Sequence, residues 1–339
     1  MGLNISKGKA LLLIVLIVIT GITVGIYFYE QYQKNKIDVN IAYIEGDLHH
    51  LTYYVAQEKG FYKNAGLNVQ GLGQPNGGAI MNSFIANQID MAYLGFAPLV
   101  FTRFNNPGAR VKVLSAVNVE GSALIVKNSP SIQNASDLNG TKIAVPAANN
   151  MQDFILSMVL DLGGIPRSNI TLVTMSVSQM PLALETGDID GYVAWEPFAV
   201  KGLNNSIGKY LYNSSTLWPD HPCCVLAVHE DFLASNSPIV EKVVQVHKET
   251  TEWILTHWNE AMEIAMQKMN LNAEQASTAM SNVKYVWNVN KTQMISFVDK
   301  VIQFNPNVNF SSPGIPSDIT NSTAFIDWLV KTDILEKLK

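Results

Sequence analysis

Short apolar runs alternate with amphipathic stretches along most of the chain after residue 37. The apolar runs predict strands at residues 39–44, 67–72, 90–95, 111–117 and 122–127, and again at 137–146, 170–175, 190–195 and 223–228. The amphipathic stretches predict helices at 51–66, 77–89, 151–165 and 178–189. Residues 239–269 form one long amphipathic stretch that we expect to be broken once, and the remainder is mostly helical. Glycines at positions 60 and 66 punctuate the end of the first helix.

The alternation of strands and helices predicts an α/β fold with parallel sheets covered by helices, and the restart near residue 137 predicts two lobes. We expect residues 37–125 and 224–339 to form lobe 1, and residues 126–223 to form lobe 2. Open α/β sheets bind ligands at the carboxyl ends of their strands. The loops that follow strands are therefore candidate contact sites, at residues 45–50, 73–78, 95–98, 118–121, 147–150 and 195–198.

The N-terminal segment, residues 1–36, has a different composition. Residues 10–29 carry no charge, and such a stretch is long enough to cross a hydrocarbon core of about 30 Å as one helix. The following residues offer no small-residue cleavage site, so we expect an uncleaved membrane anchor. Two lysines on each side give no strong indication of its orientation.

Eight Asn-x-Ser/Thr sequons after the predicted anchor favour an extracytoplasmic body, although an Asn- and Ser-rich chain also produces some by chance. They begin at Asn134, Asn139, Asn169, Asn204, Asn213, Asn290, Asn309 and Asn321. We therefore expect a cell-membrane protein with a single-pass anchor and an extracytoplasmic C-terminal domain.

Composition narrows the function classes. The net charge is -5, only 15% of residues are charged, and the chain has three arginines, Arg103, Arg110 and Arg167. Without a basic run, nucleic acid is not an expected partner. Two cysteines do not make a disulfide framework, so the fold must rest on its apolar core, for which 47% hydrophobic residues suffice.

The candidate ligand-contacting residues share a position in or beside the loops after strands. They are Asp47, His49, His50, Gln74, Asn76, Gly78, Gly95, Phe96, Ala97, Asn118, Glu120, Asn149, Gln152, Trp195, Glu196, His221 and Cys223. Trp195 and Glu196 are the strongest pair, because they end a strand directly before Pro197. Asp47 is equally well explained as a helix N-cap, and Phe96 either stacks on a planar ligand or fills core space.

The only two cysteines are adjacent, in the segment HPCCVL at residues 221–226. Zinc ligands usually follow spacings such as Cys-x₂₋₄-Cys, and we expect neighbouring cysteines to diverge from a single ion. A nucleophile would need an activating base, and a disulfide between neighbours would be strained. We therefore expect Cys223 and His221 to line the edge of a ligand cleft, with no metal site and no catalytic residue.

Five segments resemble, in the same order, the substrate-binding proteins of ABC importers of the nitrate, sulfonate, taurine and thiamine-pyrimidine type. They are LTYYVAQEKGFYKNAGLNV (51–69), DMAYLGFAP (90–98), DLNGTKIAVP (137–146), ALETGDIDGYVAWEPF (183–198) and VLAVHEDFLASNSPIVEKVVQVH (225–247). The resemblance implies a two-lobed type II periplasmic-binding fold that closes on a solute. It also implies a monomer that docks on an ABC permease and its ATPase, without cofactor or enzymatic activity.

The expected solute is small and polar: a sulfonate or taurine, a nitrate-type anion, or a pyrimidine. The scarcity of arginine weakens the simple-anion interpretation, and the acidic residues Asp47, Glu120 and Glu196 suit an amine or a pyrimidine better. Two alternatives remain open. One is an enzyme similar to thiamine-pyrimidine synthases, and the other is a copper- or zinc-capture protein that uses His49, His50, His221 and Cys223.

Overall fold

The computed structural model describes residues 20–24, 38–305 and 308–338. The predicted anchor at residues 10–29 lies outside the described residues, apart from the helical residues 20–24. In the described part of the chain, no helix combines the length and the apolar character needed to cross a membrane.

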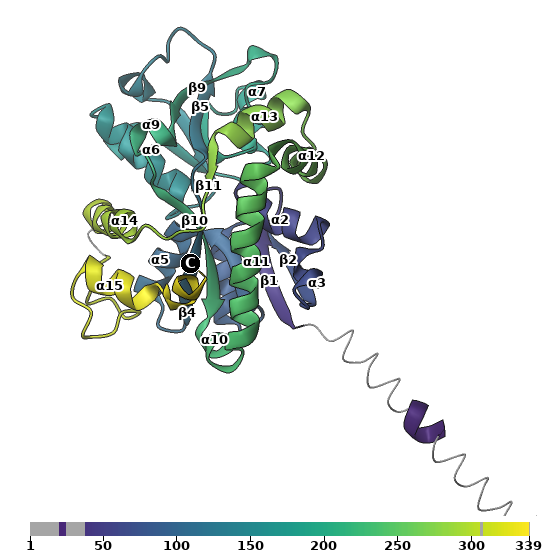
Figure 1. Cartoon of the computed structure of the whole chain (residues 1–339). Coiled ribbons are helices and arrows are strands. Elements are labelled where there is room, and N and C mark those ends of the chain that lie inside the picture. Colours follow the sequence, from purple (N-terminus) through teal and green to yellow (C-terminus); the bar gives the residue numbers. More distant parts are fainter. Residues whose placement is uncertain (1–19, 25–37, 306–307, 339) are drawn as a thin grey trace, which may run out of the picture.

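The first lobe is built on a six-stranded sheet in the order β11-β4-β10-β3-β1-β2 (Figure 1). Its strands are β1 (Val39–Ile44), β2 (Val69–Gln74), β3 (Met91–Gly95), β4 (Val111–Glu120), β10 (Pro222–His229) and β11 (Val283–Tyr285). β1 runs parallel to β2 and β3, whereas β10 runs antiparallel to β3 and β4, and β11 antiparallel to β4. The expectation of a purely parallel sheet is therefore wrong, because β10 and β11 enter after the chain has returned from the other sheet.

The second sheet has five strands in the order β7-β6-β8-β5-β9. They are β5 (Ser122–Lys127), β6 (Lys142–Val145), β7 (Thr171–Thr174), β8 (Gly191–Trp195) and β9 (Gly208–Asn213). β6 is parallel to β7 and β8, and β5 is antiparallel to β8 and β9. The hydrophobic pattern did not predict β9, because this edge strand is mostly half-buried and its apolar run is only three residues long.

Helices cover both sheets. They are α2 (Leu51–Glu58), α3 (Phe61–Asn64), α4 (Gly77–Ile85), α5 (Phe96–Asn105), α6 (Met151–Leu162), α7 (Met180–Thr186), α8 (Phe198–Lys201), α9 (Ser214–Leu217), α10 (Glu230–Ser235), α11 (Ser237–Thr256), α12 (Trp258–Met269), α13 (Ala273–Ser281), α14 (Lys291–Phe304), α15 (Ser322–Leu329) and α16 (Asp333–Lys337). The 3₁₀ turns are η1 (Leu48–His50), η2 (Ala135–Leu138), η3 (Arg167–Asn169) and η4 (Asn204–Ser206).

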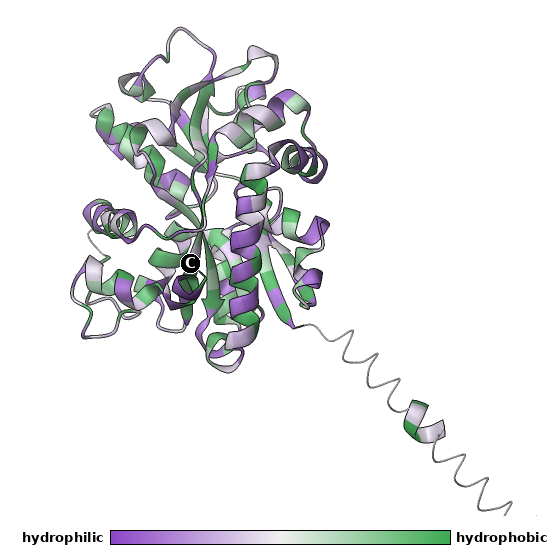
Figure 2. Ribbon diagram, in the orientation of Figure 1, coloured by the Kyte–Doolittle hydropathy of each residue, from purple (hydrophilic) through white to green (hydrophobic). Residues whose placement is uncertain are grey.

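Two predicted helices are divided in the structure. The helix expected at 51–66 is interrupted at Gly60, whose φ of 69° lies in the left-handed region. The long stretch at 239–269 is broken once, as expected, at His257 between α11 and α12. Figure 2 shows the hydrophobic strands inside each lobe and many hydrophilic residues on the visible face of α11. This distribution agrees with the amphipathic pattern of α11, whose valines are buried and whose lysines and glutamates are not.

The chain passes from the first sheet to the second through a single residue. β4 ends at Glu120 and β5 begins at Ser122, so that Gly121, with a φ of 87°, forms the crossing. The return lies between β9 and β10, and β10 already begins at Pro222. We therefore propose lobe boundaries at Gly121 and His221, in place of the boundaries near 125 and 223 expected from the sequence.

Candidate ligand-binding site

A small cavity lies where strand ends of the two sheets face each other. The first sheet contributes the ends of β1, β2 and β3 and the start of β10, and the second sheet contributes the end of β8 and the start of α6. The lining residues are Ile44, Asp47, His49, Asn76, Gly77, Gly95, Pro98, Asn150, Met151, Gln152, Trp195, Cys223 and Cys224. The space open to the centre of a water molecule is about 30 Å³. Since one water needs at least ~10–15 Å³ of such space, the cavity admits only a very small species in this conformation.

Three surface hollows are larger, at about 440, 540 and 340 Å³, and the third lies beside α7 and α8 with no strand residue in its lining. The first lies beside α6 and includes the ion pair of Asp153 and Arg167, and the second lies beside α16. None of the three collects strand ends from both sheets. The inter-lobe cavity is therefore the better candidate for the ligand site, although its volume is smaller.

Three helix N-termini face the cavity. Asn76, Gly95 and Asn150 are the N-cap residues of α4, α5 and α6, and all three line it. The side-chain oxygens of Asn76 and Asn150 accept hydrogen bonds of 2.9 Å from Ala79 N and Asp153 N within their own helices. The aligned peptide dipoles make this part of the wall electropositive.

The 3₁₀ turn after β1 places Asp47 and His49 in the opposite part of the wall. Asp47 Oδ1 accepts a hydrogen bond of 2.9 Å from His49 N, so Asp47 is the N-cap of η1 and also lines the cavity. The N-cap interpretation of Asp47 is therefore confirmed, and its contact with a ligand stays a prediction. His49 Nε2 lies 2.8 Å from Gly121 O, and a carbonyl oxygen only accepts, so Nε2 carries a hydrogen.

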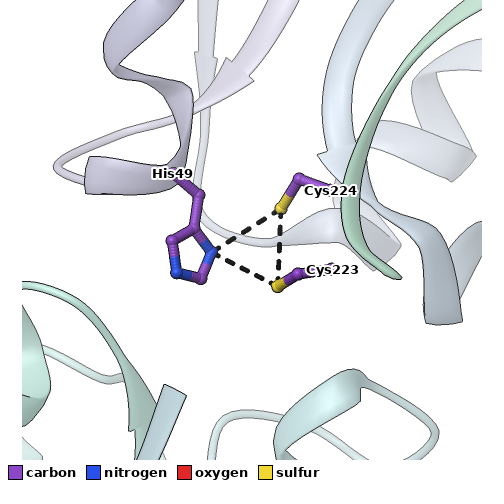
Figure 3. A group of neighbouring side chains, drawn as sticks. All are labelled: His49, Cys223 and Cys224. Atoms are coloured by element: carbon purple, nitrogen blue, oxygen red, sulfur yellow. Dashed lines mark hydrogen bonds between the residues drawn. The ribbon is translucent and has the colours of Figure 1, made fainter. Parts of the chain in front are cut away.

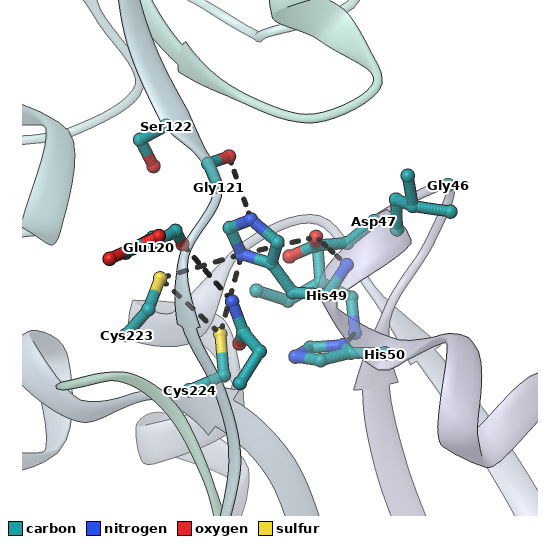
Figure 4. A network of polar contacts seen from close by, with 12 residues as sticks. Gly46, Asp47, His49, His50, Glu120, Gly121, Ser122, Cys223 and Cys224 are labelled. Atoms are coloured by element: carbon teal, nitrogen blue, oxygen red, sulfur yellow. Dashed lines mark hydrogen bonds and ion pairs between the residues drawn. The ribbon is translucent and has the colours of Figure 1, made fainter. Parts of the chain in front are cut away.

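The other ring nitrogen of His49 faces the two thiols (Figure 3). Its Nδ1 lies 3.5 Å from Cys223 Sγ and 3.7 Å from Cys224 Sγ, and the two sulfur atoms are 4.0 Å apart. Asp47 Oδ1 is 3.6 Å from the same Nδ1. All four side chains are almost fully buried, and Figure 4 shows them together beside the chain crossing at Gly121.

Burial and mutual contact change the acidity of these groups. Burial raises the pKa of Asp47 to about 7. Burial alone lowers the pKa of His49, but the neighbouring Cys223 and Asp47 outweigh it and raise that pKa. The hydrogen bond from Cys224 and the nearby imidazole hold the pKa of Cys223 well below its ordinary value, whereas burial raises the pKa of Cys224. These pKa shifts favour a thiolate at Cys223, a thiol at Cys224 and a protonated ring at His49 when the site holds no ligand.

A strand irregularity explains why adjacent cysteines point to the same place. β10 pairs Pro222 with Val119 and Cys224 with Asn118, so Cys223 is an extra residue in the ladder. Side chains of successive residues normally alternate between faces of a sheet, but a bulge re-aims one of them. The expectation that neighbouring cysteines diverge is therefore wrong for Cys223 and Cys224.

Trp195 and Gln152 form the part of the wall that belongs to the second lobe. Gln152 Nε2 donates to Ser122 Oγ at 2.9 Å. Trp195 is 5% exposed, and its Nε1 is a buried donor that has no hydrogen-bond partner among the described residues. A buried donor without an acceptor is destabilising, so this indole is available for a ligand.

The cavity contains seven of the residues predicted from the sequence. They are Asp47, His49, Asn76, Gly95, Gln152, Trp195 and Cys223. The remaining predicted residues lie elsewhere: His50, Gln74, Gly78, Phe96, Ala97, Asn118, Glu120, Asn149, Glu196 and His221. Most of them are within a few residues of a lining position, but their side chains serve the fold.

Three of these residues belong to the packing around the sheet and the first helices. Phe96 and Ala97 are fully buried at the start of α5, and the ring of Phe96 packs on Phe297 with centroids 5.2 Å apart. The core interpretation of Phe96 is therefore confirmed. His50 Nδ1 accepts a hydrogen bond of 3.0 Å from Ile44 N, which leaves the hydrogen of the neutral ring on Nε2.

Glu196 differs most from its expected role as a ligand partner. Its carboxylate accepts hydrogen bonds from Asn282 Nδ2 at 2.7 Å, Tyr210 OH at 3.0 Å and Val200 N at 3.1 Å. It is fully buried, and burial raises its pKa against these three donors. The carboxylate joins the second sheet to α13 and the start of α8, away from the cavity.

The residues near the chain crossing are also structural. Glu120 Oε1 accepts from Asp220 N at 2.8 Å, and Asn118 Nδ2 donates to Glu120 O at 3.1 Å. His221 Nδ1 lies 2.7 Å from Trp218 O and therefore donates to it. Gln74 and Gly78 flank the cavity residues Asn76 and Gly77, but Gln74 is half-buried at the end of β2 and Gly78 is exposed.

Six lining residues were missed: Ile44, Gly77, Pro98, Asn150, Met151 and Cys224. Asn150 was recoverable, because an asparagine three residues before Asp153 is typical of an N-cap, and the predicted Asn149 is one residue too early. Asn149 instead has a φ of 61° and borders the hollow beside α6. Cys224 was not recoverable from the pattern, because the bulge that aims it is a feature of strand pairing.

Solved structures of low sequence identity share this fold. The ligand binding component of an ABC-type import system from Staphylococcus aureus, solved with zinc bound, gives a TM-score of 0.76 at 16% identity, over 90% of this chain and 99% of that one. The periplasmic nitrate-binding protein NrtA from Synechocystis also gives 0.76 at 16% identity, over 88% and 87%. The chain therefore has the two-lobed fold of periplasmic binding proteins.

The amino-acid sequence matches a known protein family. The model of the NMT1-like family matches residues 32–269, which is more than two thirds of the 339 residues. The chain belongs to the NMT1-like family.

Two relatives with assigned names match part of the chain. The nitrate/nitrite binding protein NrtA of Nostoc is 21% identical over 220 residues, which are 59% of this chain and 50% of that protein. The chain thus spans about half the length of this relative. A putative aliphatic sulfonates-binding protein of Bacillus subtilis is 21% identical over 234 residues, which cover 68% of this chain and 70% of that one.

Proposed function

We propose that this protein is the extracytoplasmic solute-binding component of an ABC importer. It captures a small polar solute between its lobes and delivers it to a permease and its ATPase. The observation that carries the proposal is the cavity of about 30 Å³ at the facing strand ends, which is lined from both lobes. Relatives that are named as nitrate/nitrite and sulfonate binding proteins support the same role.

The groups that line the cavity favour a solute that has hydrogen-bond acceptor atoms on one side. Trp195 Nε1 lacks an acceptor within the described structure, and the N-termini of α4, α5 and α6 favour negative charge. None of the described lining residues is lysine or arginine. An anionic group would therefore be held by backbone N–H groups and the indole rather than by a cationic side chain.

The proposal includes no enzymatic step. The relatives favour neither the synthase-like enzyme nor the metal-capture protein that would use His49, His50, His221 and Cys223. The clusters of possible metal ligands among the described residues do not include that four-residue set: His221 belongs to neither cluster, and His50 Nδ1 accepts a hydrogen bond from Ile44 N. We also propose the single-pass anchor at residues 10–29 and a monomeric body outside the cytoplasm, on the basis of the apolar run and the sequons.

Thermal unfolding of the full-length protein with a panel of solutes tests the function. The panel contains nitrate, nitrite, bicarbonate, taurine, alkanesulfonates, aminopyrimidines and amino acids. A solute at about 100 times its dissociation constant adds about 2.7 kcal/mol to the free energy of unfolding. The same solute should stabilise the Trp195→Phe variant less.

Two results would contradict the proposal. If no solute or ion changes the unfolding temperature, the binding role fails. If the purified protein converts a stabilising solute to another compound, the protein is an enzyme and the non-catalytic part of the proposal is wrong.

A further inference from the structure

We propose that His49, Cys223 and Cys224 bind one thiophilic metal ion, Zn²⁺ or Cu⁺, in the inter-lobe cavity. The inference deepens the proposed function by naming a ligand class for the same cavity. The role of the ion as transported cargo rests on the proposed importer function. The binding of the ion rests only on the geometry of the three side chains. From the sequence, metal binding was only an alternative, with His49, His50, His221 and Cys223 as ligands, and a site that uses both adjacent cysteines was not expected.

The separations between the two sulfur atoms and His49 Nδ1 already match those between the ligands of a metal ion. With bonds of about 2.3 Å to sulfur and about 2.05 Å to nitrogen, tetrahedral angles separate two sulfurs by about 3.8 Å and sulfur from nitrogen by about 3.5 Å. Trigonal angles widen these separations to about 4.0 and 3.8 Å. The observed separations are 4.0 Å between the sulfurs, and 3.5 and 3.7 Å from them to His49 Nδ1. An ion therefore fits between the three atoms with only small displacements.

The histidine is oriented as a metal ligand. Because His49 Nε2 donates to Gly121 O, the nitrogen that can lose its proton to a metal ion is Nδ1, which faces the sulfurs. A carbonyl that holds the second ring nitrogen is the usual outer-shell partner of a metal-bound histidine. Gly121 is required for this contact, since a Cβ at that position would overlap His49 Nε2.

The surroundings favour a soft cation over a hard one. Two thiols and an imidazole are ligands that select Zn²⁺ and Cu⁺, whereas Mg²⁺ and Ca²⁺ require oxygen ligands. Met151 adds a thioether to the lining from the second lobe, and Asp47 adds a carboxyl group 3.6 Å from His49 Nδ1. The described lining residues include no lysine or arginine, and thiolates of Cys223 and Cys224 would offset the positive ends of α4, α5 and α6.

A second cluster, formed by Asp47, His50 and Cys224, does not make an equivalent site. His50 Nδ1 accepts a hydrogen bond from Ile44 N, and its Nε2 therefore carries the hydrogen of the neutral ring. Neither nitrogen offers a lone pair without loss of that bond. The ion is therefore bound by His49 Nδ1, Cys223 Sγ and Cys224 Sγ.

Titration of the reduced full-length protein with Co²⁺, Zn²⁺ and Cu⁺ tests the inference. Co²⁺ bound by thiolate gives a charge-transfer absorption, Zn²⁺ is measured by competition with a chromogenic chelator, and Cu⁺ by anaerobic competition with a copper(I) chelator. We expect one ion per chain, confirmed by native mass spectrometry of the unmodified protein. Cys223→Ser, Cys224→Ser and His49→Gln should each weaken binding by more than the ~10–100-fold that loss of an outer-shell partner costs.

Matched variants separate this site from surface binding and from misfolding. His257→Gln changes an exposed histidine and should leave the titration unchanged. Met151→Leu should weaken Cu⁺ more than Zn²⁺, because thioether favours Cu⁺. Thermal unfolding without metal shows whether each variant is folded, and the stoichiometry of the unmodified protein does not depend on any variant.

The outcomes distinguish this inference from the proposed function. No thiolate absorption from the unmodified protein, or unchanged binding in the variant that combines Cys223→Ser with Cys224→Ser, overturns the metal site. If a solute of the panel still stabilises the protein in that case, the importer role stands. If the metal binds with one ion per chain and depends on both cysteines, the site is supported, and failure of both tests overturns both proposals.

Discussion

The carbonyl oxygen of Gly121 accepts a hydrogen bond from His49 Nε2 at 2.8 Å, and thereby ties the turn after β1 to the crossing between the sheets. The same oxygen accepts from Glu196 N of the second sheet at 3.0 Å. One peptide group thus links the first lobe, the crossing and the second lobe. Any movement of the lobes that changes the φ and ψ angles of Gly121 would also move the imidazole ring of His49.

Replacement of Gly121 by alanine should destabilise the fold and disturb the site. Gly121 has a φ of 87°, which costs an alanine about 1–2 kcal/mol. The new Cβ would also overlap the ring of His49, and overpacking of this kind adds ~1–3 kcal/mol. Urea unfolding of Gly121→Ala gives the loss in free energy of unfolding. Gly140→Ala is the matched control, because Gly140 has a φ of 79° and open space around it. Equal losses in the two variants would show that the contact with His49 is unimportant.

Glu196 should matter for stability and not for ligand affinity. Removal of its carboxylate in Glu196→Ala leaves the donors of Asn282, Tyr210 and Val200 without their acceptor. Buried groups that lose their partners cost about 1–3 kcal/mol each, so we expect a total loss of about 3 kcal/mol or more. Glu196→Gln keeps one acceptor oxygen and should lose less. Chemical unfolding measures both variants. A large loss of ligand affinity in Glu196→Gln at unchanged stability would restore the role expected from the sequence.

Trp195→Phe should weaken solute binding with little loss of stability. The variant keeps an aromatic ring in the wall but removes Nε1, a buried donor that lacks an acceptor in the described structure. One hydrogen bond is worth about 0.5–1.5 kcal/mol, which corresponds to up to about tenfold in the dissociation constant. Calorimetric titration with the stabilising solute measures this change. Trp253→Phe, at a half-buried tryptophan of α11 that does not line the cavity, is the control. Unchanged affinity in Trp195→Phe would mean that the indole donor does not contact the solute.

Buried His247 should make the protein less stable in mild acid. Its Nε2 donates to Ala116 O at 2.7 Å, and burial lowers its pKa to about 4. Between pH 6.5 and pH 4 the unfolded chain binds a proton on this residue and the folded chain does not, so the free energy of unfolding falls as the pH falls. The full effect is about 3 kcal/mol, on the scale of 1.36 kcal/mol for each pH unit.

Comparison with His247→Gln isolates this contribution. The difference in free energy of unfolding between the unmodified protein and the variant should shift by about 3 kcal/mol between pH 7 and pH 4. His257→Gln, at an exposed position, should show no such shift. Parallel pH profiles for the unmodified protein and His247→Gln would refute the prediction.

The sequence predicted much of the fold because its strands are buried apolar runs and its long helices are amphipathic. β1, β3 and β5 lie within one residue of their predicted bounds, and the break between α11 and α12 was expected. The 3₁₀ turns and β9 were not expected, because such short elements contain too few residues to show a hydrophobic periodicity. The antiparallel direction of β10 also has no local signal, since it depends on the path of the chain between the sheets.

The sequence by itself determined the elements, the two α/β blocks and the loops from which the site is built. It placed Asp47, His49, Asn76, Gln152, Trp195 and Cys223 at strand ends or helix starts, where the fold brings them together. Only the tertiary structure decided which atoms converge. Strand pairing created the bulge that turns Cys223 and Cys224 to one face, and the crossing at Gly121 fixed the ring of His49 against them. Contacts between residues this far apart in the chain depend on pairing register and lobe packing, which local patterns of hydrophobicity do not encode.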